Sequence, residues 1–157
     1  MLKTGNPRFW EARIWCLAFL LAAVFPALAK GKEPTVEELK VRLSGASVAE
    51  RPGLCIQISE LQLGYANRLY SAGDSEKAQA ALADVVAFSE LARDYSIQSH
   101  KHEKQSEIAI RKMIRKLADL KHTVALADQK PLQDAIGRLE KTRDDLLSAM
   151  FPKGDKR

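Results

Sequence analysis

The sequence predicts an all-α fold, an up-down bundle of four main helices with a short helix before them, after a cleavable signal peptide. Long segments rich in Ala, Leu, Lys, Glu and Gln carry apolar residues at spacings of three and four, which is the periodicity of an amphipathic helix. Runs of β-branched residues are absent, and only 8 Gly and 6 Pro interrupt the 157 residues. Short turns between long helices favour antiparallel neighbours, and therefore the up-down arrangement.

Residues 1–29 have the composition of a secretory signal peptide. The first 13 residues contain three basic residues, and an uncharged apolar run follows over residues 14–25. Pro26 ends this run, and the small residues Ala27 and Ala29 predict cleavage after Ala29. The alternative, an uncleaved anchor, needs about 20 apolar residues, more than the run provides. We therefore expect export by the general secretory route, to the periplasm or the medium, and no transmembrane helix in the mature chain.

Cleavage would leave 128 of the 157 residues, which is enough for one domain with its own core. The signal carries three bases and one acid, so the formal net charge of +5 falls to +3 in the mature chain. This weak positive charge does not indicate nucleic-acid binding. Cys55 would be the one cysteine left, which excludes an internal disulfide. Its apolar neighbours predict a buried thiol, with an intermolecular disulfide or a reactive thiol as the alternatives.

The mature chain divides into a linker, a domain and a tail. The expected bounds are a linker at 30–34, a helical bundle domain at 35–151 and a polar tail at 152–157. The predicted helices cover residues 35–45, 52–71, 75–96, 107–127 and 131–150. Thr35 and Glu38 have the spacing of a capping box at the first of them. Residues 97–106 are polar and contain no Gly or Pro, and their sequence leaves open whether the helix breaks or continues.

Each long helix carries an apolar stripe that is expected to face the core. The stripe in 52–71 consists of Leu54, Ile58, Leu61, Tyr65 and Leu69. The stripe in 75–96 consists of Ala78, Leu82, Val85, Ser89 and Ala92, whose small members favour a close neighbour. The stripe in 107–127 is spaced like a coiled-coil seam and consists of Ile110, Met113 or Ile114, Leu117, Leu120 and Val124. The stripe in 131–150 consists of Leu132, Ile136, Leu139, Leu146 and Met150, and Arg143 interrupts it.

A helical hairpin is indicated by a Tyr, a Gly-Asp turn and a helix that opens with an acid, a Lys and a small packing residue. These positions are Tyr70, Gly73, Asp74 and Ala78. Their order resembles the tetratricopeptide-repeat family. The resemblance covers about residues 55–92 and has no second copy at the ~34-residue period, so it implies the shape of one hairpin and no repeat array. The whole chain also resembles small exported bacterial helical proteins of unknown function, which implies no mechanism.

No catalytic or metal-binding motif stands out, so we expect no enzyme activity and no cofactor. The weak metal candidates are His100, Glu103 and Glu107, which share a face only if a continuous helix runs through them. Non-covalent haem ligation would fall to His122, Met113 or Met150.

Four cations form the strongest binding candidate. Arg111, Lys112, Arg115 and Lys116 lie at i, i+1, i+4 and i+5, so a helix presents them as one strip. Further lysines extend the strip at Lys101, Lys104 and Lys121. The functional hypothesis is docking to an anionic partner, such as lipid phosphates or an acidic protein, and the alternative is a solvated face.

Amphipathic helices without a convergent polar site predict a non-enzymatic protein of the cell envelope or extracellular space, with a structural or protein-interaction role. The alternative is a small ligand- or metal-binding helical bundle of the periplasm. A third possibility is self-association through apolar side chains left outside the core, such as Phe88, Ile108 and Phe151.

Overall fold

A computed structural model describes residues 33–152, and the residues from Pro34 onward form one compact unit. The elements are α2 (Val36–Gly45), α3 (Arg51–Ser71), α4 (Ser75–Ser99), α5 (Glu103–Lys121) and α6 (Leu126–Met150). No strand occurs among the described residues, so the all-α prediction is confirmed. The proposed cleavage residues Ala27 and Ala29 lie outside the described part of the chain.

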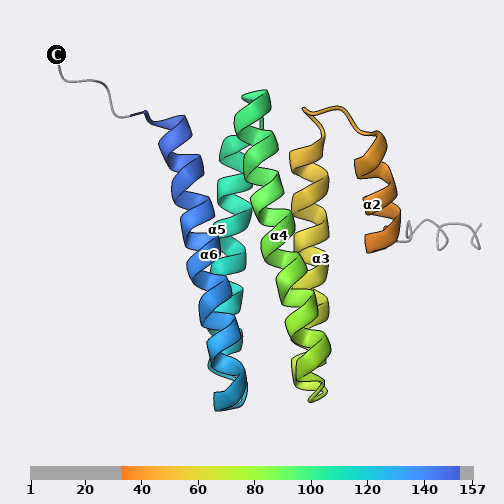
Figure 1. The fold of residues 1–157 in the computed structure, drawn as a ribbon, viewed down its shortest axis with the longest axis vertical. Helices are drawn as coiled ribbons and strands as arrows, with labels where there is room; N and C mark the ends of the chain where they lie inside the picture. Colours follow the sequence, from red (N-terminus) through yellow and green to blue (C-terminus); the bar gives the residue numbers. More distant parts are fainter. Residues whose placement is uncertain (1–32, 153–157) are drawn as a thin grey trace, which may run out of the picture. The chain divides into compact units, whose positions relative to one another are not determined.

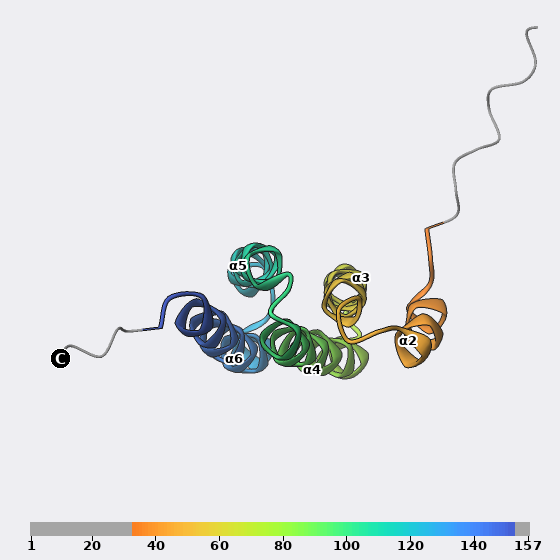
Figure 2. The same cartoon turned by 90° about the horizontal axis from the view of Figure 1, so that it is seen from above.

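The helices run side by side within this unit (Figure 1) and form two layers when seen from above. Figure 2 shows α3 and α5 in one layer and α2, α4 and α6 in the other. Helix α4 packs against α3, α5 and α6, whereas α3 and α6 have no Cα atoms within 8 Å of each other. Each of α3, α4, α6 and α5 contacts the next in that order, and α5 contacts α3, so the four helices close into a ring in which α3 and α6 are opposite corners. The unit consists of two packed hairpins, α3–α4 and α5–α6, with α2 against α3.

Helix α2 begins at a capping box, as predicted. The Glu38 amide donates to the Thr35 hydroxyl at 3.2 Å, and the Thr35 amide donates to the Glu38 carboxylate at 2.9 Å. Leu39 is the one residue of α2 that is fully buried. It packs with Leu54 and Ile58 of α3 in a small apolar cluster. The docking of α2 thus depends largely on one side chain.

The buried face of α3 differs from the predicted stripe. Tyr65 is exposed, and the buried side chains are instead Pro52, Leu54, Cys55, Ile58, Ser59, Leu63, Ala66 and Tyr70. The reason is that α3 contacts three neighbours, α2, α4 and α5, and the predicted stripe lies largely on its α2 side. Small residues face α4 and let the two helices approach closely, since the hydroxyls of Ser59 and Ser89 lie 3.2 Å apart.

The α3–α4 turn follows the prediction. Gly73 has a φ of 78°, a left-handed conformation that glycine adopts without a steric penalty. Asp74 then caps α4, because its carboxylate accepts a hydrogen bond from the Lys77 amide at 3.3 Å. The predicted face of α4 is buried and includes Ala78, Leu82, Val85, Ser89 and Ala92.

The polar segment at 97–106 breaks the helix. Helix α4 continues to Ser99, and then His100 and His102 adopt left-handed backbone angles, with φ of 51° and 65°. Two left-handed residues are incompatible with a continuing right-handed helix. Helix α5 restarts at Glu103, earlier than the predicted 107. The hydroxyls of Ser96 and Ser106 lie 2.9 Å apart and join the two helices beside this turn, both side chains being buried.

The predicted boundary between the last two helices is wrong. Helix α5 ends at Lys121, before the predicted 127, because the Thr123 amide and hydroxyl both donate to the Leu120 carbonyl oxygen. Helix α6 then begins at Leu126 and includes Pro131, which was expected to open it. Pro131 lacks an amide hydrogen, so near the start of α6 it costs the helix one backbone hydrogen bond.

One large core joins both hairpins. It contains Leu63, Tyr70, Ala78, Leu82, Val85, Val86, Ile110, Met113, Leu117, Leu120, Leu132, Ala135, Ile136, Leu139 and Leu146. The predicted stripes of the last two helices are therefore confirmed, apart from their ends. Val124 is half-buried in the α5–α6 connection, and Met150 is half-buried at the end of α6.

Candidate functional site

The four cations of the predicted strip are exposed side by side on α5. Arg111, Lys112, Arg115 and Lys116 are all exposed to solvent. The opposite side of the same helix is buried in the main core through Ile110, Met113, Leu117 and Leu120. Because the core fixes the rotation of α5, it holds the four cations on the outer side of the α3–α5 layer.

Only one member of the strip has an ion-pair partner among the described residues. The Arg111 Nε lies 3.5 Å from the Glu107 carboxylate. Glu107 is 8% exposed and also lies 3.9 Å from the Arg143 guanidinium of α6. Glu107 therefore serves as the acid of a partly buried pair, and three strip residues, Lys112, Arg115 and Lys116, carry no such partner within residues 33–152.

The outer surface of α5 extends this positive charge along most of the helix. At 100° per residue, Lys104, Arg111, Lys112 and Arg115 fall within an arc of about 100°, with Ile108 near its centre. Lys116 lies at the edge of the arc, about 18 Å along the axis from Lys104 at 1.5 Å per residue. Asp119 is the acid exposed on this arc, at its C-terminal end. We call these five cations together the α5 cationic face.

A shallow groove runs beside the α5 cationic face, between α3 and α5. Its volume is about 460 Å³, and its lining residues are Glu60, Leu63, Gly64, Asn67, Lys116, Asp119, Leu120 and Thr123. Lys116 is the one cationic side chain in this lining, and Glu60 and Asp119 oppose it with two acids. The concentrated positive charge therefore lies on the convex surface of α5 and not in the groove.

The weak metal candidates do not converge. His100 is in the left-handed turn, with its Nδ1 3.9 Å from the Glu103 carboxylate, while Glu107 faces Arg111 and Arg143. Within residues 33–152 no three His, Cys, Asp or Glu side chains are placed to hold a metal ion. The haem candidates differ in exposure, because Met113 is buried in the core and His122 is exposed at the end of α5.

Cys55 is free and fully buried, as predicted. Burial raises the pKa of its thiol to about 11, and the nearby positive charge of Arg51 opposes that shift. A thiol with this pKa stays protonated near neutral pH, so Cys55 lacks the thiolate that nucleophilic chemistry needs.

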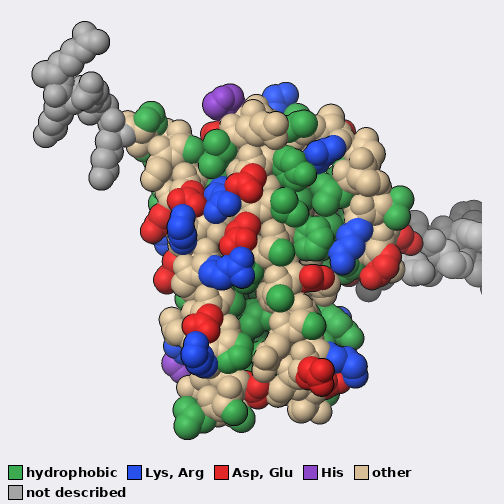
Figure 3. Space-filling model, viewed as in Figure 1, with side chains coloured by type: hydrophobic (Ala, Val, Ile, Leu, Met, Phe, Trp, Pro, Cys, Tyr) green, Lys and Arg blue, Asp and Glu red, His purple; other side chains and the backbone are tan. Residues whose placement is uncertain are grey.

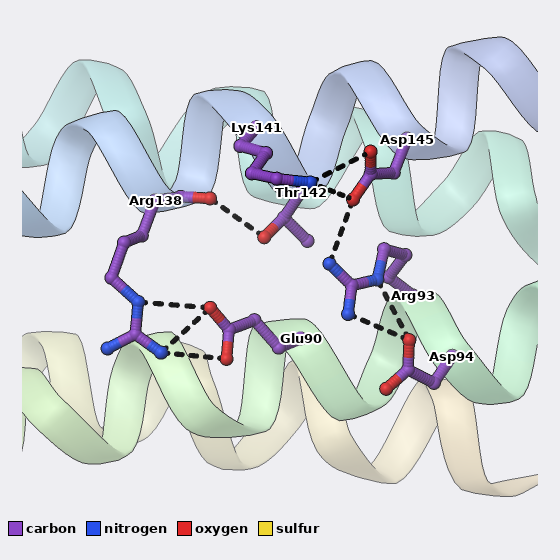
Figure 4. A network of polar contacts seen from close by, with 7 residues as sticks. All are labelled: Glu90, Arg93, Asp94, Arg138, Lys141, Thr142 and Asp145. Atoms are coloured by element: carbon purple, nitrogen blue, oxygen red, sulfur yellow. Dashed lines mark hydrogen bonds and ion pairs between the residues drawn. The ribbon is translucent and has the colours of Figure 1, made fainter.

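The other layer of the fold has a different charge pattern. Figure 3 shows basic and acidic side chains mixed over the surface of α4 and α6. Two ion pairs join the two helices (Figure 4): the Arg138 guanidinium lies 2.8 Å from the Glu90 carboxylate, and Arg93 lies 3.0 Å from Asp145. Lys141 also reaches Asp145 at 3.2 Å. The cations of α4 and α6 thus have acidic partners, whereas most cations of the α5 cationic face have none among the described residues.

The sequence did not reveal the pair formed by Glu107 and Arg143. One signal was available, since Arg143 interrupts an otherwise apolar stripe and a charge at such a position needs a partner. The Arg143 Nε has no hydrogen-bond partner among the described residues, and neither does the buried Tyr70 hydroxyl. Burial and the negative charge of Asp128 raise the pKa of Tyr70, so its hydroxyl stays protonated.

The residues predicted for self-association differ in exposure. Phe88 is half-buried against the α2–α3 cluster, and Ile108 is half-buried on α5. Phe151 is 71% exposed after the end of α6. They lie on three different elements and do not form one apolar surface by themselves.

No protein-family profile, curated protein or solved structure matches this chain. Within residues 33–152, each helix is too short or too polar to cross a lipid bilayer.

Proposed function

We propose that this chain is an exported, non-enzymatic up-down helical bundle that acts by binding an anionic partner through the α5 cationic face. The signal peptide predicted at residues 1–29 supports export, with the periplasm or the medium as the destination.

One observation carries this proposal, namely that Lys112, Arg115 and Lys116 are exposed together without partners among the described residues. Like charges four residues apart on a helix, such as Lys112 and Lys116, destabilise it by a few tenths of a kcal/mol per pair. The α4–α6 surface of the same protein avoids this cost by pairing its charges. A bound anionic partner would provide the missing negative charge for α5.

Site-specific photo-crosslinking tests the proposal. A photoreactive amino acid would replace Gln105, which is exposed on α5 between the directions of Lys112 and Lys116, and in a second protein Ser148, which is exposed on α6. Neither substitution alters the charge of the protein. We expect the Gln105 variant to crosslink to a component of the envelope fraction, and we expect 1 M salt or added polyglutamate to suppress the adduct, because salt screens exposed charges. Equal crosslinking from Ser148, or none from Gln105, would contradict the proposal.

A further inference from the structure

We propose that the partner of the α5 cationic face is the headgroup surface of an anionic lipid bilayer, on which α5 lies parallel to the membrane plane. This inference rests on the proposed function, since it names the class of partner that the same surface binds. It follows from the shape, the charge density and the central apolar residue of the face.

The shape of the site favours a broad anionic surface over a peptide. The cations lie on the convex side of one helix, and the neighbouring groove contributes two acids and one lysine. A peptide ligand usually needs a groove or an exposed strand edge to bury its side chains. A bilayer surface needs no groove, because its phosphates are spread over a plane that a convex helix can approach along its whole length.

The charge density of the face matches known electrostatic recognition of lipid. Clusters of four to eight basic residues on one helix are typical of segments that bind anionic headgroups. The face provides five within about 18 Å, from Lys104 to Lys116. Glu107 does not neutralise them as a group, because it is buried between Arg111 and Arg143.

The apolar residue on this arc occupies a favourable position. Ile108 is half-buried and lies between Lys104 and Lys112 on the outer side of α5. When the flanking lysines contact phosphates, the exposed part of Ile108 comes level with the headgroups. Interfacial helices place apolar side chains at this depth. Binding is therefore mainly electrostatic, with a small apolar contribution.

Cosedimentation with lipid vesicles provides the first test. The protein used in this test starts at Lys30, the residue after the predicted cleavage site. It retains the whole core, because both apolar clusters of the fold lie within residues 34–152. We expect binding to vesicles of equal parts phosphatidylglycerol and phosphatidylcholine, and none to phosphatidylcholine alone. Raising the ionic strength from about 0.1 to about 1 M, which shortens the Debye length from about 10 to about 3 Å, is expected to abolish binding.

A charge-matched pair of variants assigns the binding to α5. The triple variant Lys112→Gln, Arg115→Gln, Lys116→Gln removes three cations without a partner in the described chain, and we expect a loss of affinity of about 100-fold. The control Lys77→Gln, Lys130→Gln, Lys141→Gln removes three charges from α4 and α6, where the side chains are 69%, 82% and 74% exposed. We expect the control to bind nearly as well as the parent. Circular dichroism verifies that both variants are folded.

A fluorescence measurement reports the orientation of the helix. Both tryptophans of the chain, Trp10 and Trp15, precede Lys30, so Ile108→Trp introduces the one tryptophan of this protein, which can be excited selectively without exciting the tyrosines. Its emission should shift to the blue when anionic vesicles are added. The same substitution at the exposed Ala87 of α4, which lies in the other layer, should show no shift.

The two proposals fail in different ways. If the Gln105 crosslinks are salt-sensitive but lead to an acidic protein, and anionic vesicles leave the protein in solution, the bilayer assignment is overturned and the anionic-partner proposal stands. If the protein binds no vesicles and gives no crosslinked product, both proposals are overturned. Equal loss of vesicle binding in the two triple variants would also overturn the bilayer assignment to α5.

Discussion

Gly137 occupies a helical position on α6 where an added Cβ atom would meet no other atom within 4 Å. A glycine inside a helix destabilises it by about 1 kcal/mol relative to alanine, chiefly through the entropy of the unfolded chain. We therefore expect Gly137→Ala to raise the free energy of unfolding by about 1 kcal/mol, measured by urea denaturation. The matched substitution Gly73→Ala should destabilise the protein, because φ is 78° there. A neutral or destabilising Gly137→Ala would contradict this account.

Cys55 gives the stability a predictable dependence on alkaline pH. Burial raises the pKa of the folded thiol to about 11, while the unfolded thiol keeps a value near 9. Below pH 9 the thiol is protonated in both the folded and the unfolded state, so it does not make the free energy of unfolding depend on pH there. Between pH 9 and 11 the unfolded state loses its proton first, and the stability that the neutral thiol contributes declines as the pH rises.

The Cys55→Ala variant isolates this effect from the other groups that titrate at high pH. The expected result is that the difference in the free energy of unfolding between parent and variant shrinks from pH 9 to pH 11. Denaturant titrations at several pH values measure it, and a difference that stays constant over this range would contradict the assignment.

Sequence reasoning succeeded at residues whose role follows from their own helix. The exposure of the cationic strip and the burial of Cys55 follow from helical periodicity and from apolar neighbours. It failed at Tyr65, which lies on the predicted apolar stripe yet is 44% exposed. Periodicity locates an apolar face but does not say how many neighbours the helix has, and α3 has three, namely α2, α4 and α5. The pairing of Arg143 with Glu107 also depends on tertiary contacts.

Among the elements, α2 depends on the fewest contacts. Leu39 is its one buried residue, and Val41 of the same helix is 73% exposed. We expect Leu39→Ala to release α2 from α3, because a helix this short is not stable in isolation. Hydrogen exchange should show loss of protection over residues 36–45, with the protection of α4 and α5 nearly unchanged. Val41→Ala is the control and should leave α2 protected, whereas a loss of protection throughout the protein would contradict the separate docking of α2.

The helix boundaries show where local sequence signals are sufficient. The capping box at Thr35 and the turn at Gly73 were predicted correctly, because each has a strong residue preference. The break at His100 and His102 contains no Gly or Pro, so composition gave no decision between a break and a continuous helix. Pro131 was placed at a helix start, which is its usual position, but the structure accommodates it one turn later.

The whole described unit should unfold as one, because the main core contains side chains from both hairpins. Leu117 of α5 is fully buried in that core. We expect Leu117→Ala to lower the free energy of unfolding by about 3 kcal/mol, through lost burial and the cavity left behind. Exchange of the slowest amides in α3–α4 should accelerate by the same free energy as in α5–α6. Selective loss of protection in α5–α6 would show that the hairpins unfold separately.

The arrangement of the helices was the least predictable feature at this scale. Helix number and the all-α class followed from composition and periodicity, but the side-by-side packing of the hairpins did not. It depends on which faces meet, including the ion pairs of Arg138 with Glu90 and of Arg93 with Asp145 on the joint between α4 and α6. A charged residue on an exposed helix face could pair with any of several opposite charges on other helices. Periodicity within one helix therefore did not predict these ion pairs.

The ring of contacts formed by α3, α4, α6 and α5 has a consequence for how this architecture can vary in length. A closed ring of helices has a fixed number of members, because adding one forces all the others to move apart. Helix α2 lies outside the ring, and among the described helices its Cα atoms come within 8 Å of α3 alone, so it can be gained or lost without disturbing the packing elsewhere. Helix α6 presents exposed Lys130, Asp134, Lys141 and Asp144 away from the core, so charged side chains cover the outer side of the ring there. Replacing them with apolar residues would be the first step in adding a second helix outside the ring.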